Sequence, residues 1–511
     1  MCGIAGSFGH TNIKHKSIVK EILSNIEHRG REGTLYELKS LGRLGAIGAN
    51  RLPIIQELFN KQPALSPNSK FIIVMNGQVF NYQELYADLC NENTVFSYKF
   101  PGDTLVLAAA IEKWGISKAI DKLVWEGVFL VIDLKNNKIL AARDHIGIKP
   151  LYYCQNLNRL FFASEIKSLL GYGNDSEIKQ VEPGSFIEFD LVSTECLTSV
   201  KWWRPNLIPS KKYNEIELQS ELLKLLSKAI KLRVPKDPYA ILLSGGIDSS
   251  IILKLCVQFN SNVTAYVLCN DTSPDLPYAR KICKDLGVKL VEVMIETSES
   301  MFKRLNNLVK TLETWEWHVI NHAAPMEKLF GVIRKDNFKV VLTGEGADEL
   351  FFGYENYTEK PDNKTFELDR LSRINYLHRT NCLRLDRMGM LNGLECRVPF
   401  LDRALVEFAL SIPPSLCIKD GYNKKPLREI LKNIYSEKFA HRKKLSFARG
   451  VGFDYGSKNI ESVFGVVEYD SNLSILPNWE NLPRYPLERL FLSYFLKAGY
   501  QRALHLNSRS I

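Results

Sequence analysis

The sequence predicts a protein of two domains, an α+β domain followed by an α/β domain with a doubly wound parallel sheet. A chain of 511 residues is too long for one ordinary hydrophobic core. Roughly the first 200 residues contain many short apolar runs bounded by Gly, Asn or Asp, as strands are. From about residue 215, strand patterns alternate with helical patterns, which is the order of a parallel sheet with crossover helices. We therefore expect one domain over residues 2–205 and a second over residues 215–511.

The first domain is expected to be mixed and rich in strands. Its apolar runs read CGIAGSF, FIIVMNG, GVFLVID, KILAARD, RLFFAS and GSFIEFD. Helical patterns lie near residues 16–27 and 103–114, and the second begins at Asp103-Thr104, a pair suited to capping a helix. The segment WWRPNLIPSKK, near residues 200–215, is expected to contain the domain boundary.

The second domain is expected to start with a long helix, because IELQSELLKLLSKAIKLRV has amphipathic spacing. YAILLSGGIDSS then reads as a buried strand, a glycine turn and the start of a helix. VTAYVLC, LPYARKICKDLG and VKLVEVMI follow as strand, helix and strand. A longer helical stretch leads to another buried strand and glycine turn, KVVLTGEGADELF, and the remainder from about residue 360 is expected to be mostly helical.

The composition excludes several classes of protein. Apolar residues make up 45% and charged residues 24% of the chain, as in soluble globular proteins. The net charge of +10 suits an anionic ligand, but no basic block is dense enough to predict nucleic-acid binding. No apolar stretch is long enough to span a bilayer, and the N-terminus has no signal-peptide pattern, so we expect a cytoplasmic protein. Ten cysteines without a CxxC pair argue against a disulfide scaffold and a zinc site.

The segment SGGIDSS, residues 244–250, predicts a site for phosphate groups. It joins a buried strand to a helix, and in an open α/β sheet ligands bind beyond the carboxyl ends of the strands. A glycine pair lets backbone N–H groups approach an anion, and the helix N-terminus favours negative charge. Asp248 fits beside phosphate only if a cation such as Mg²⁺ lies between them. The alternative is a plain Ser/Gly turn that caps a helix.

A second glycine turn, TGEGADE at residues 343–349, also follows a buried strand and could lie at the same sheet edge. Asp348 would then be a second magnesium ligand, and Glu345 would face the reacting group. The alternative for this segment is an acidic helix cap.

Cys2 is a candidate nucleophile, provided that Met1 is removed. The free α-amino group of Cys2, with an ordinary pKa of about 7.7–8.0, could then accept the thiol proton near neutral pH. In NGQVFN, Asn76 and Gly77 follow an apolar strand and could form an oxyanion hole. The alternatives are a buried strand start for Cys2 and an ordinary turn for Asn76-Gly77.

Two further residues of the front half could bind an α-amino acid. Arg51, in NRLPI, could grip a carboxylate with two hydrogen bonds, and Asp103, in PGDT, could bind an ammonium group. The alternatives are an ordinary surface arginine and an ordinary helix cap.

Taken together, the motifs resemble a known enzyme family. SGGIDSS resembles the PP-loop of ATP pyrophosphatases, which cleave ATP to AMP and pyrophosphate. The motifs of the front half occur in the order found in class II glutamine amidotransferases: Cys2-Gly-Ile, HRG at 28–30, RLPI, NGQVFN, GD at 102–103, RDHIGIKPLYY at 143–153 and FASEIKSL at 162–169. With SPDL at 273–276, TGEGADELFFGY and ECRVPFLD at 395–402, the chain is similar to glutamine-dependent asparagine synthetases.

The resemblance implies that residues 2–205 form an Ntn-hydrolase αββα sandwich in which Cys2 attacks glutamine. The residues implied to bind glutamine or its oxyanion are Arg51, Leu52, Ile54, Asn76, Gly77, Gln78 and Asp103. The ammonia released would pass to the second domain. There ATP would activate a carboxylate, with aspartate as the leading candidate, as an acyl-AMP that ammonia then attacks. No membrane or nucleic-acid partner is expected, and a homodimer is the candidate assembly.

The resemblance also implies the ligands of ATP and Mg²⁺ in the second domain. Glu345 matches the acidic residue needed for the intermediate and for ammonia deprotonation, and Asp248 and Asp348 match the magnesium ligands. The residues implied to bind ATP or pyrophosphate are Leu243, Ser244, Gly245, Gly246, Asp248, Ser249, Ser250, Leu268, Thr343, Gly344, Arg384 and Lys444. For Lys444, a solvated surface charge is the alternative.

Three departures from the family pattern bear on function. HRGRE stands where the family has HRGPD, and Gln78 makes NGQ of the usual NGE. In ETWEWHVINHAAPM, residues 313–326, a loop in which the family has two threonines and an arginine carries His318, Val319 and Asn321. The acceptor could therefore be another carboxylate, such as a sugar uronic acid, a peptide or a natural-product intermediate, or the loop could simply have drifted. A non-catalytic sensor and an RNA-modifying enzyme are further alternatives.

Overall fold

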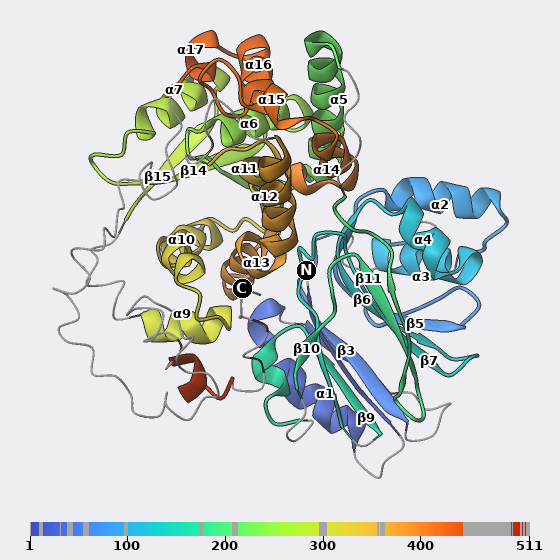
Figure 1. Ribbon diagram of the computed structural model, residues 1–511. Coiled ribbons are helices and arrows are strands. Elements are labelled where there is room, and N and C mark those ends of the chain that lie inside the picture. Colours follow the sequence, from blue (N-terminus) through green and yellow to red (C-terminus); the bar gives the residue numbers. More distant parts are fainter. Residues whose placement is uncertain are drawn as a thin grey trace. The chain divides into compact units, whose positions relative to one another are not determined.

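The computed structural model divides into two compact units (Figure 1), Met1–Arg204 with Phe495–Ile511 as unit 1 and Pro205–Tyr494 as unit 2. For residues 32–37 and 317 only the backbone is described. The residues that the structure describes are 2–9, 14–30, 32–37, 44–54, 61–96, 101–156, 158–172, 177–206, 213–295, 304–354, 357, 363–442, 492, 494–500, 503 and 506.

Unit 1 contains two six-stranded sheets whose strand pairs are antiparallel. The first sheet has the order β10 (Lys179–Gln180), β8 (Tyr152–Asn156), β9 (Arg159–Ala163), β1 (Cys2–Phe8), β3 (Gly45–Arg51) and β2 (Glu32–Glu37). The second has the order β12 (Cys196–Lys201), β11 (Ser185–Asp190), β7 (Lys138–Arg143), β6 (Trp125–Asp133), β5 (Phe71–Val79) and β4 (Ala64–Leu65).

The alternation of side chains along β5 shows how the layers of unit 1 are built. Ile72 and Val74 share a core with residues of the first sheet, so the two sheets pack face to face. Ile73 and Met75 point to the opposite face, where a second core contains residues of α2 (Tyr82–Asn91), α3 (Asp103–Trp114) and α4 (Ile116–Lys122).

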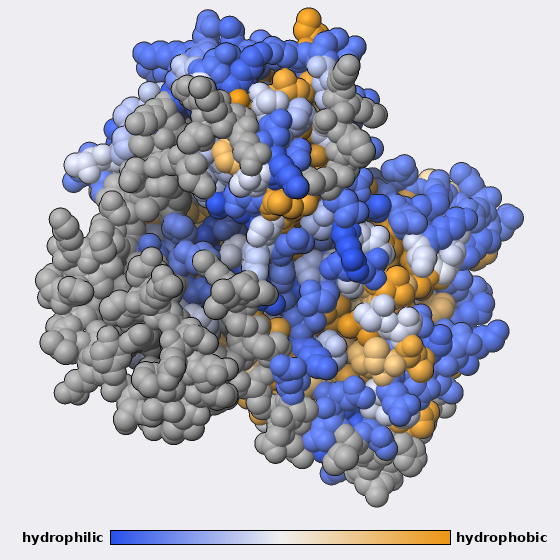
Figure 2. All heavy atoms as spheres, in the orientation of Figure 1, coloured by the Kyte–Doolittle hydropathy of each residue, from blue (hydrophilic) through white to orange (hydrophobic). Residues whose placement is uncertain are grey.

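Helices therefore cover both outer faces of unit 1. Helix α1 (His15–Ser24) packs on β1 and β3 of the first sheet. On the face of the molecule in Figure 2, hydrophilic residues cover the outer side of α2, whose Leu85 and Leu89 are buried in the core. The αββα arrangement that the resemblance implies is confirmed.

Unit 2 is built on a five-stranded parallel sheet, so the predicted doubly wound sheet is confirmed. Its order is β15 (Lys289–Met294), β14 (Val263–Cys269), β13 (Tyr239–Leu242), β16 (Val340–Leu342) and β17 (Glu395–Arg397). The strand order reverses between β13 and β16, which is the point where open α/β sheets bind ligands. Strand β17 lies in a segment that we expected to be mostly helical.

The helices of unit 2 include the predicted long first helix and the crossovers. Their bounds are α5 Glu215–Arg233, α6 Ile247–Phe259, α7 Leu276–Leu286, α9 Leu305–Leu312, α10 Trp317–Lys335, α11 Ala347–Leu350, α12 Asn363–Tyr376, α13 Asn381–Leu391, α14 Arg403–Leu410, α15 Pro414–Cys417, α16 Lys425–Ile434 and α17 Glu437–Ala440. In the parts of the chain that the structure describes, none of the helices combines the length and apolar character needed to cross a membrane.

The end of the chain is assigned differently in the structure and in the sequence prediction. The sequence predicts a second domain that runs to residue 511, whereas the structure groups Phe495–Ile511 with unit 1. Phe495, Tyr500 and Ala503 are buried, and a Cβ on Gly499 would lie 3.6 Å from Leu170 of unit 1. The exact domain limits stay a prediction.

A buried ion pair ties α13 to the end of α9 in unit 2, and its loss should destabilise this unit. The guanidinium of Arg387 lies 2.5 Å from the carboxylate of Glu313, and the two side chains are 1% and 0% exposed. We expect Arg387→Ala to lower the free energy of unfolding by about 3–5 kcal/mol, because it removes the guanidinium group that faces a buried carboxylate. Unfolding in urea, monitored by hydrogen exchange in peptides of α9 and α13, measures this change.

Arg280→Ala is the matched control for that experiment. It removes the exposed partner of Glu292, with an Arg Nε–carboxylate distance of 2.7 Å. Because solvent screens an exposed pair, the control should leave the unfolding transition unchanged. An equally small effect of both substitutions would contradict the prediction.

Candidate active sites

In unit 1, Cys2 begins β1 and pairs with Arg51 at the end of β3. The Cys2 side chain is only 3% exposed, and its backbone N–H donates to Asn76 Oδ1 at 3.1 Å. Burial raises the pKa of the Cys2 thiol, whereas a hydrogen bond from the Leu52 backbone and the charge of Arg51 act in the opposite direction. Cys2 is therefore both the buried start of a strand and the neighbour of the predicted oxyanion residue.

Asn76 and Gly77 lie within β5 rather than in a turn, so the turn alternative is wrong. The Asn76 Nδ2 group is buried and has no hydrogen-bond partner among the described residues, as expected of a donor that awaits an oxyanion. Gly77 has φ +149°, and a Cβ there would lie 2.1 Å from the carbonyl oxygen of Glu126 on β6. Only glycine fits this close approach of two strands.

The residues predicted to bind an amino acid are buried near the same strands. Arg51 is 7% exposed, so it is not an ordinary surface arginine. Asp103 is 4% exposed and is not a helix cap, because Gly102 occupies the N-cap of α3. The Asp103 carboxylate instead accepts hydrogen bonds from the backbone N–H groups of Val79 on β5 (3.1 Å) and Thr104 (2.9 Å). The prediction that Asp103-Thr104 caps this helix was therefore wrong.

The other predicted glutamine-binding residues adjoin these elements. Leu52 and Ile54 are half-buried directly after β3, and Gln78 is buried in β5 opposite Glu126.

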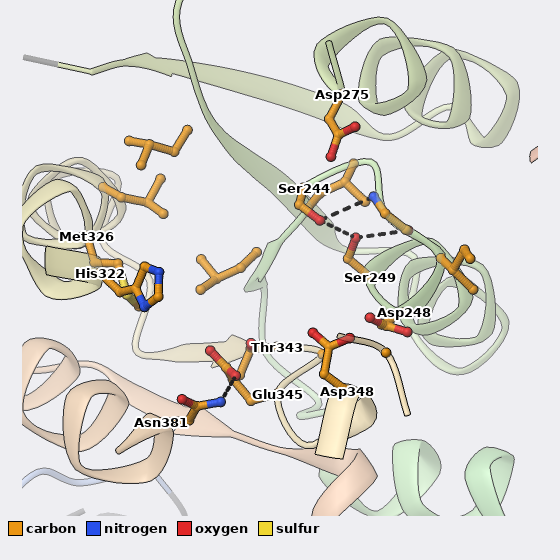
Figure 3. A pocket seen from close by; sticks show the side chains of 18 of the residues that line it. Ser244, Asp248, Ser249, Asp275, His322, Met326, Thr343, Glu345, Asp348 and Asn381 are labelled. Carbon is orange, nitrogen blue, oxygen red and sulfur yellow. Dashed lines mark hydrogen bonds between the residues drawn. The ribbon is translucent and has the colours of Figure 1, made fainter. Parts of the chain in front are cut away.

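In unit 2, the predicted residues surround a cavity of about 280 Å³ at the carboxyl ends of β13, β14 and β16 (Figure 3). Of the residues predicted for ATP, Mg²⁺ and catalysis, the cavity is lined by Leu243, Ser244, Gly246, Asp248, Ser249, Leu268, Thr343, Gly344, Glu345, Asp348 and Arg384. Gly245 and Ser250 do not line it, and Lys444 lies outside the described residues.

The SGGIDSS segment forms a tight loop before α6. The Ser244 Oγ atom accepts a hydrogen bond from the Gly246 N–H at 3.2 Å and lies 3.2 Å from Ser249 Oγ (Figure 3). Gly245 has φ +76°, and a Cβ there would lie 2.6 Å from the Asp275 carbonyl oxygen, so glycine is required. Ser250 is fully buried behind the loop. Ile247, Asp248 and Ser249, the first residues of α6, line the cavity, and a helix N-terminus favours an anion.

Lys424 is a functional candidate that we did not predict. Its Nζ atom lies 2.5 Å from Asp248 Oδ2 and 2.5 Å from Asp348 Oδ1. Burial alone would lower the pKa of Lys424, but the two carboxylates raise it above its ordinary value, so an ammonium lies between them. A Cβ on Gly353 would lie 2.1 Å from Lys424 Cε, which shows how tightly this contact is packed.

The two carboxylates fit a divalent cation. They already hold a positive charge between them, and carboxylate oxygens are the ligands that Mg²⁺ prefers. Lys424 gave little signal in the sequence, because a lysine in the basic run KKPLR looks like a solvated charge.

Glu345 belongs to a polar cluster beside these carboxylates. Its Oε1 atom accepts from Arg384 at 2.6 Å, and its Oε2 atom accepts from Asn381 Nδ2 at 3.0 Å (Figure 3). Asn381, which the sequence did not single out, also donates to Glu349 Oε1 at 3.0 Å. Burial, with the charges of Asp348 and Glu345, raises the pKa of Glu349 to about 7. Glu345 is thus held in place by two donors while it faces the cavity.

Arg442 and Asp275 form a second pair that we did not predict, and both residues line the cavity. The Arg442 guanidinium donates to the Asp275 carboxylate and to the Gly245 carbonyl oxygen, and it lies 4.4 Å from the centre of the Tyr278 ring. Asp275 falls in the quoted motif SPDL, which marked its segment but not its partner.

The opposite wall comes from α10, where the sequence departs from the family pattern. The sequence interpretation of residues 313–326 as a loop was wrong from Trp317 onward, because α10 begins there. His322 and Met326, one helical turn apart, line the cavity (Figure 3), whereas Val319 is buried and does not. Burial, with the charges of Arg384 and His318, lowers the pKa of His322 to about 3, so a neutral imidazole faces the site.

Both halves of the chain match family models. Residues 1–206 match the model described as a glutamine amidotransferase domain, and residues 221–373 and 358–464 match the model described as asparagine synthase. The chain is 27% identical to glutamine-hydrolyzing asparagine synthetase 2 of Oryza sativa subsp. japonica, over 89% of this chain and 78% of that protein. It is 28% identical to a probable glutamine-hydrolyzing asparagine synthetase of Acanthamoeba polyphaga mimivirus, over 88% and 86%. For the glutamine-hydrolyzing asparagine synthetase of Asparagus officinalis the identity is 29%, over 89% and 78%.

Lys424→Met tests whether the ammonium competes with a divalent cation. The substitution removes the ammonium group that lies between Asp248 and Asp348, so a divalent cation should bind there more readily. We expect Mn²⁺ to bind about tenfold more tightly than to the wild type in the absence of nucleotide, because the local carboxylate pair then favours an added charge. Electron paramagnetic resonance of free Mn²⁺ measures this affinity.

Lys425→Met is the control, since Lys425 makes ion pairs only with Asp420 and Glu429 among the contacts described. An unchanged affinity in the Lys424 variant, or an equal gain in the control, would contradict the prediction.

Proposed function

Because the chain belongs to the glutamine-dependent asparagine synthetase family and is a glutamine-dependent ligase, we propose that it transfers ammonia from glutamine to an adenylated carboxylate. The observation that carries this proposal is the cavity of unit 2. In it a phosphate-binding loop, two carboxylates suited to a cation and the positioned Glu345 lie together at the switch point of a parallel sheet.

Glutamine hydrolysis is assigned to unit 1. After removal of Met1, the α-amino group of Cys2 takes the thiol proton, and the thiolate attacks the side-chain amide carbon of glutamine. Asn76 Nδ2, which lacks a partner among the described groups, and the Gly77 N–H donate to the oxyanion. Ammonia leaves, and water hydrolyses the thioester to glutamate.

Recognition of glutamine is assigned to the two buried charges near Cys2. Arg51 binds the α-carboxylate and Asp103 binds the α-ammonium group. Gln78 adds a neutral acceptor where the family has a carboxylate, which weakens the attraction for the ammonium group without touching the nucleophile.

The synthetase reaction is assigned to unit 2. An oxygen of the acceptor carboxylate attacks the α-phosphorus of ATP, and pyrophosphate leaves toward the loop of Ser244 and Ser249. Ammonia then attacks the acyl carbon of the acyl-AMP, Glu345 accepts a proton, and AMP leaves. Asp248 and Asp348 would hold Mg²⁺, which neutralises phosphate charge when it is bound.

Aspartate is the leading acceptor, because the curated relatives are named asparagine synthetases. A different carboxylate, such as a sugar uronic acid, a peptide or a natural-product intermediate, is the second candidate. The wall formed by His322 and Met326 favours it. The two guanidinium groups that line the described cavity, those of Arg384 and Arg442, already pair with carboxylates and are not free for the α-carboxylate of aspartate. The homodimer stays a prediction.

Cys2→Ala tests the assignment of two separate reactions. We expect it to abolish glutamine hydrolysis and glutamine-dependent amidation, because no other described group attacks the amide, while ammonia-dependent amidation continues. Glutamate release and AMP release measure the two reactions.

Glu345→Gln is the converse variant. It should lower the rate of amidation by about 100-fold or more and leave the rate of glutamine hydrolysis unchanged. Loss of both reactions in either folded variant would contradict the scheme.

A panel of carboxylates identifies the acceptor. We expect aspartate, glutamine, ATP and Mg²⁺ to give equal amounts of AMP and pyrophosphate, and no ADP, because the loop type cleaves between the α- and β-phosphates. The panel also contains uronic acids and peptides. Release of AMP and pyrophosphate is measured for each carboxylate. Release of ADP would contradict the proposed chemistry, whereas AMP release with another acceptor and none with aspartate would select the second candidate.

A further inference from the structure

The buried side chain of Gln62 contacts the proposed nucleophile of unit 1. Gln62 lies just before β4 and is 5% exposed. Its Nε2 group donates to Cys2 Sγ at 3.6 Å and to Thr104 Oγ1 at 3.4 Å, and its Oε1 atom accepts from the Met75 N–H at 2.7 Å. The amide therefore touches the thiol, the residue before Asn76 and the residue after Asp103.

The orientation of this amide follows from chemistry. The backbone N–H of Met75 is a donor only, so the atom that faces it must be the oxygen of Gln62. The NH₂ group must then face Cys2. An N–H aimed at sulfur stabilises the thiolate more than the neutral thiol, because hydrogen bonds to charged groups are the stronger ones.

Among the described residues, few charged groups are placed to stabilise the Cys2 thiolate. The charge of Arg51, at the end of β3, acts to lower the pKa of the thiol, and the charge of Asp103, at the start of α3, acts to raise it. Arg29, from the turn that follows α1, donates to the Cys2 carbonyl oxygen at 3.3 Å. The α-amino group exposed by removal of Met1 would complete the set. Among the hydrogen bonds described for the chain, the one from Gln62 is made directly to Cys2 Sγ by a neutral side chain.

We propose that Gln62 is a positioning residue for glutamine hydrolysis, which holds Cys2 Sγ beside the oxyanion residues and favours its thiolate form. The inference rests on the proposed glutaminase function. Because Met75 precedes Asn76 on β5, the bond from Met75 to Gln62 fixes the thiol relative to the strand that carries the oxyanion donors. The bond to Thr104 ties the same amide to the start of α3, where Asp103 lies.

Gln62→Glu and Gln62→Met test the role of the amide. The Glu variant keeps an oxygen for Met75 but places a negative charge opposite the thiol, and the Met variant keeps the chain length without any donor. We expect kcat for glutamine hydrolysis to fall about 10- to 100-fold in both variants, with KM changed less than about threefold, since the loss concerns one hydrogen bond to a charged group. The pH at which iodoacetamide alkylates Cys2 half-maximally should rise by about one unit in the Glu variant. Mass spectrometry of the Cys2 peptide reads the alkylation.

Gln83→Glu is the matched control, because it makes the same chemical change on an exposed residue of α2. Ammonia-dependent AMP release should be unchanged in the three variants, and this also reports that the chain is folded. A lower kcat without a shift in the alkylation profile of the Glu variant would overturn the inference, because a purely structural role predicts that result. An unchanged kcat for glutamine hydrolysis in both Gln62 variants would also overturn the inference. If the wild-type protein itself releases no glutamate, the proposed function is overturned instead.

Discussion

The ammonium group of Lys424 joins two segments that line the cavity of unit 2. It bridges Asp248 at the start of α6 and Asp348 in α11, with both distances at 2.5 Å, and it comes from the residue just before α16. These segments lie far apart in the sequence but meet where the sheet order reverses. Two carboxylates this close repel each other unless a cation separates them, and the ammonium group of Lys424 lies between them.

The site of unit 1 depends on a different constraint, the close packing of two antiparallel sheets. Cys2 lies on the first sheet and Asn76 on the second, and the hydrogen bond from the Cys2 N–H to Asn76 Oδ1 joins them. Gly77 and Gly127 lie opposite each other on β5 and β6, where a side chain on either would meet the neighbouring backbone. The distance between Cys2 and Asn76 is therefore set by the packing of two sheets, because each residue lies within a strand.

Sequence reasoning succeeded where a short segment determines its own local structure. SGGIDSS and TGEGADE were correctly placed after buried strands, because the pattern of strand, glycine turn and helix is local. It failed where a residue's neighbours come from elsewhere. The pair Asp103-Thr104 was expected to cap α3, yet the Asp103 carboxylate accepts a hydrogen bond from Val79 on another element. Lys424, Asn381 and Gln62 were missed for the same reason, since their partners Asp248, Glu345 and Cys2 lie far away in the sequence.

The sequence by itself determined the two-domain order, the strand-rich first half, the parallel sheet of the second half and the identity of Cys2 and Glu345 as candidates. These follow from periodicity and from motifs that need only a few consecutive residues. Only the tertiary structure decided which charges neutralise Asp248 and Asp348, which wall His322 faces and which amide contacts Cys2. Those contacts join residues separated by tens to hundreds of positions, and their energies depend on burial and distance, which no local pattern contains.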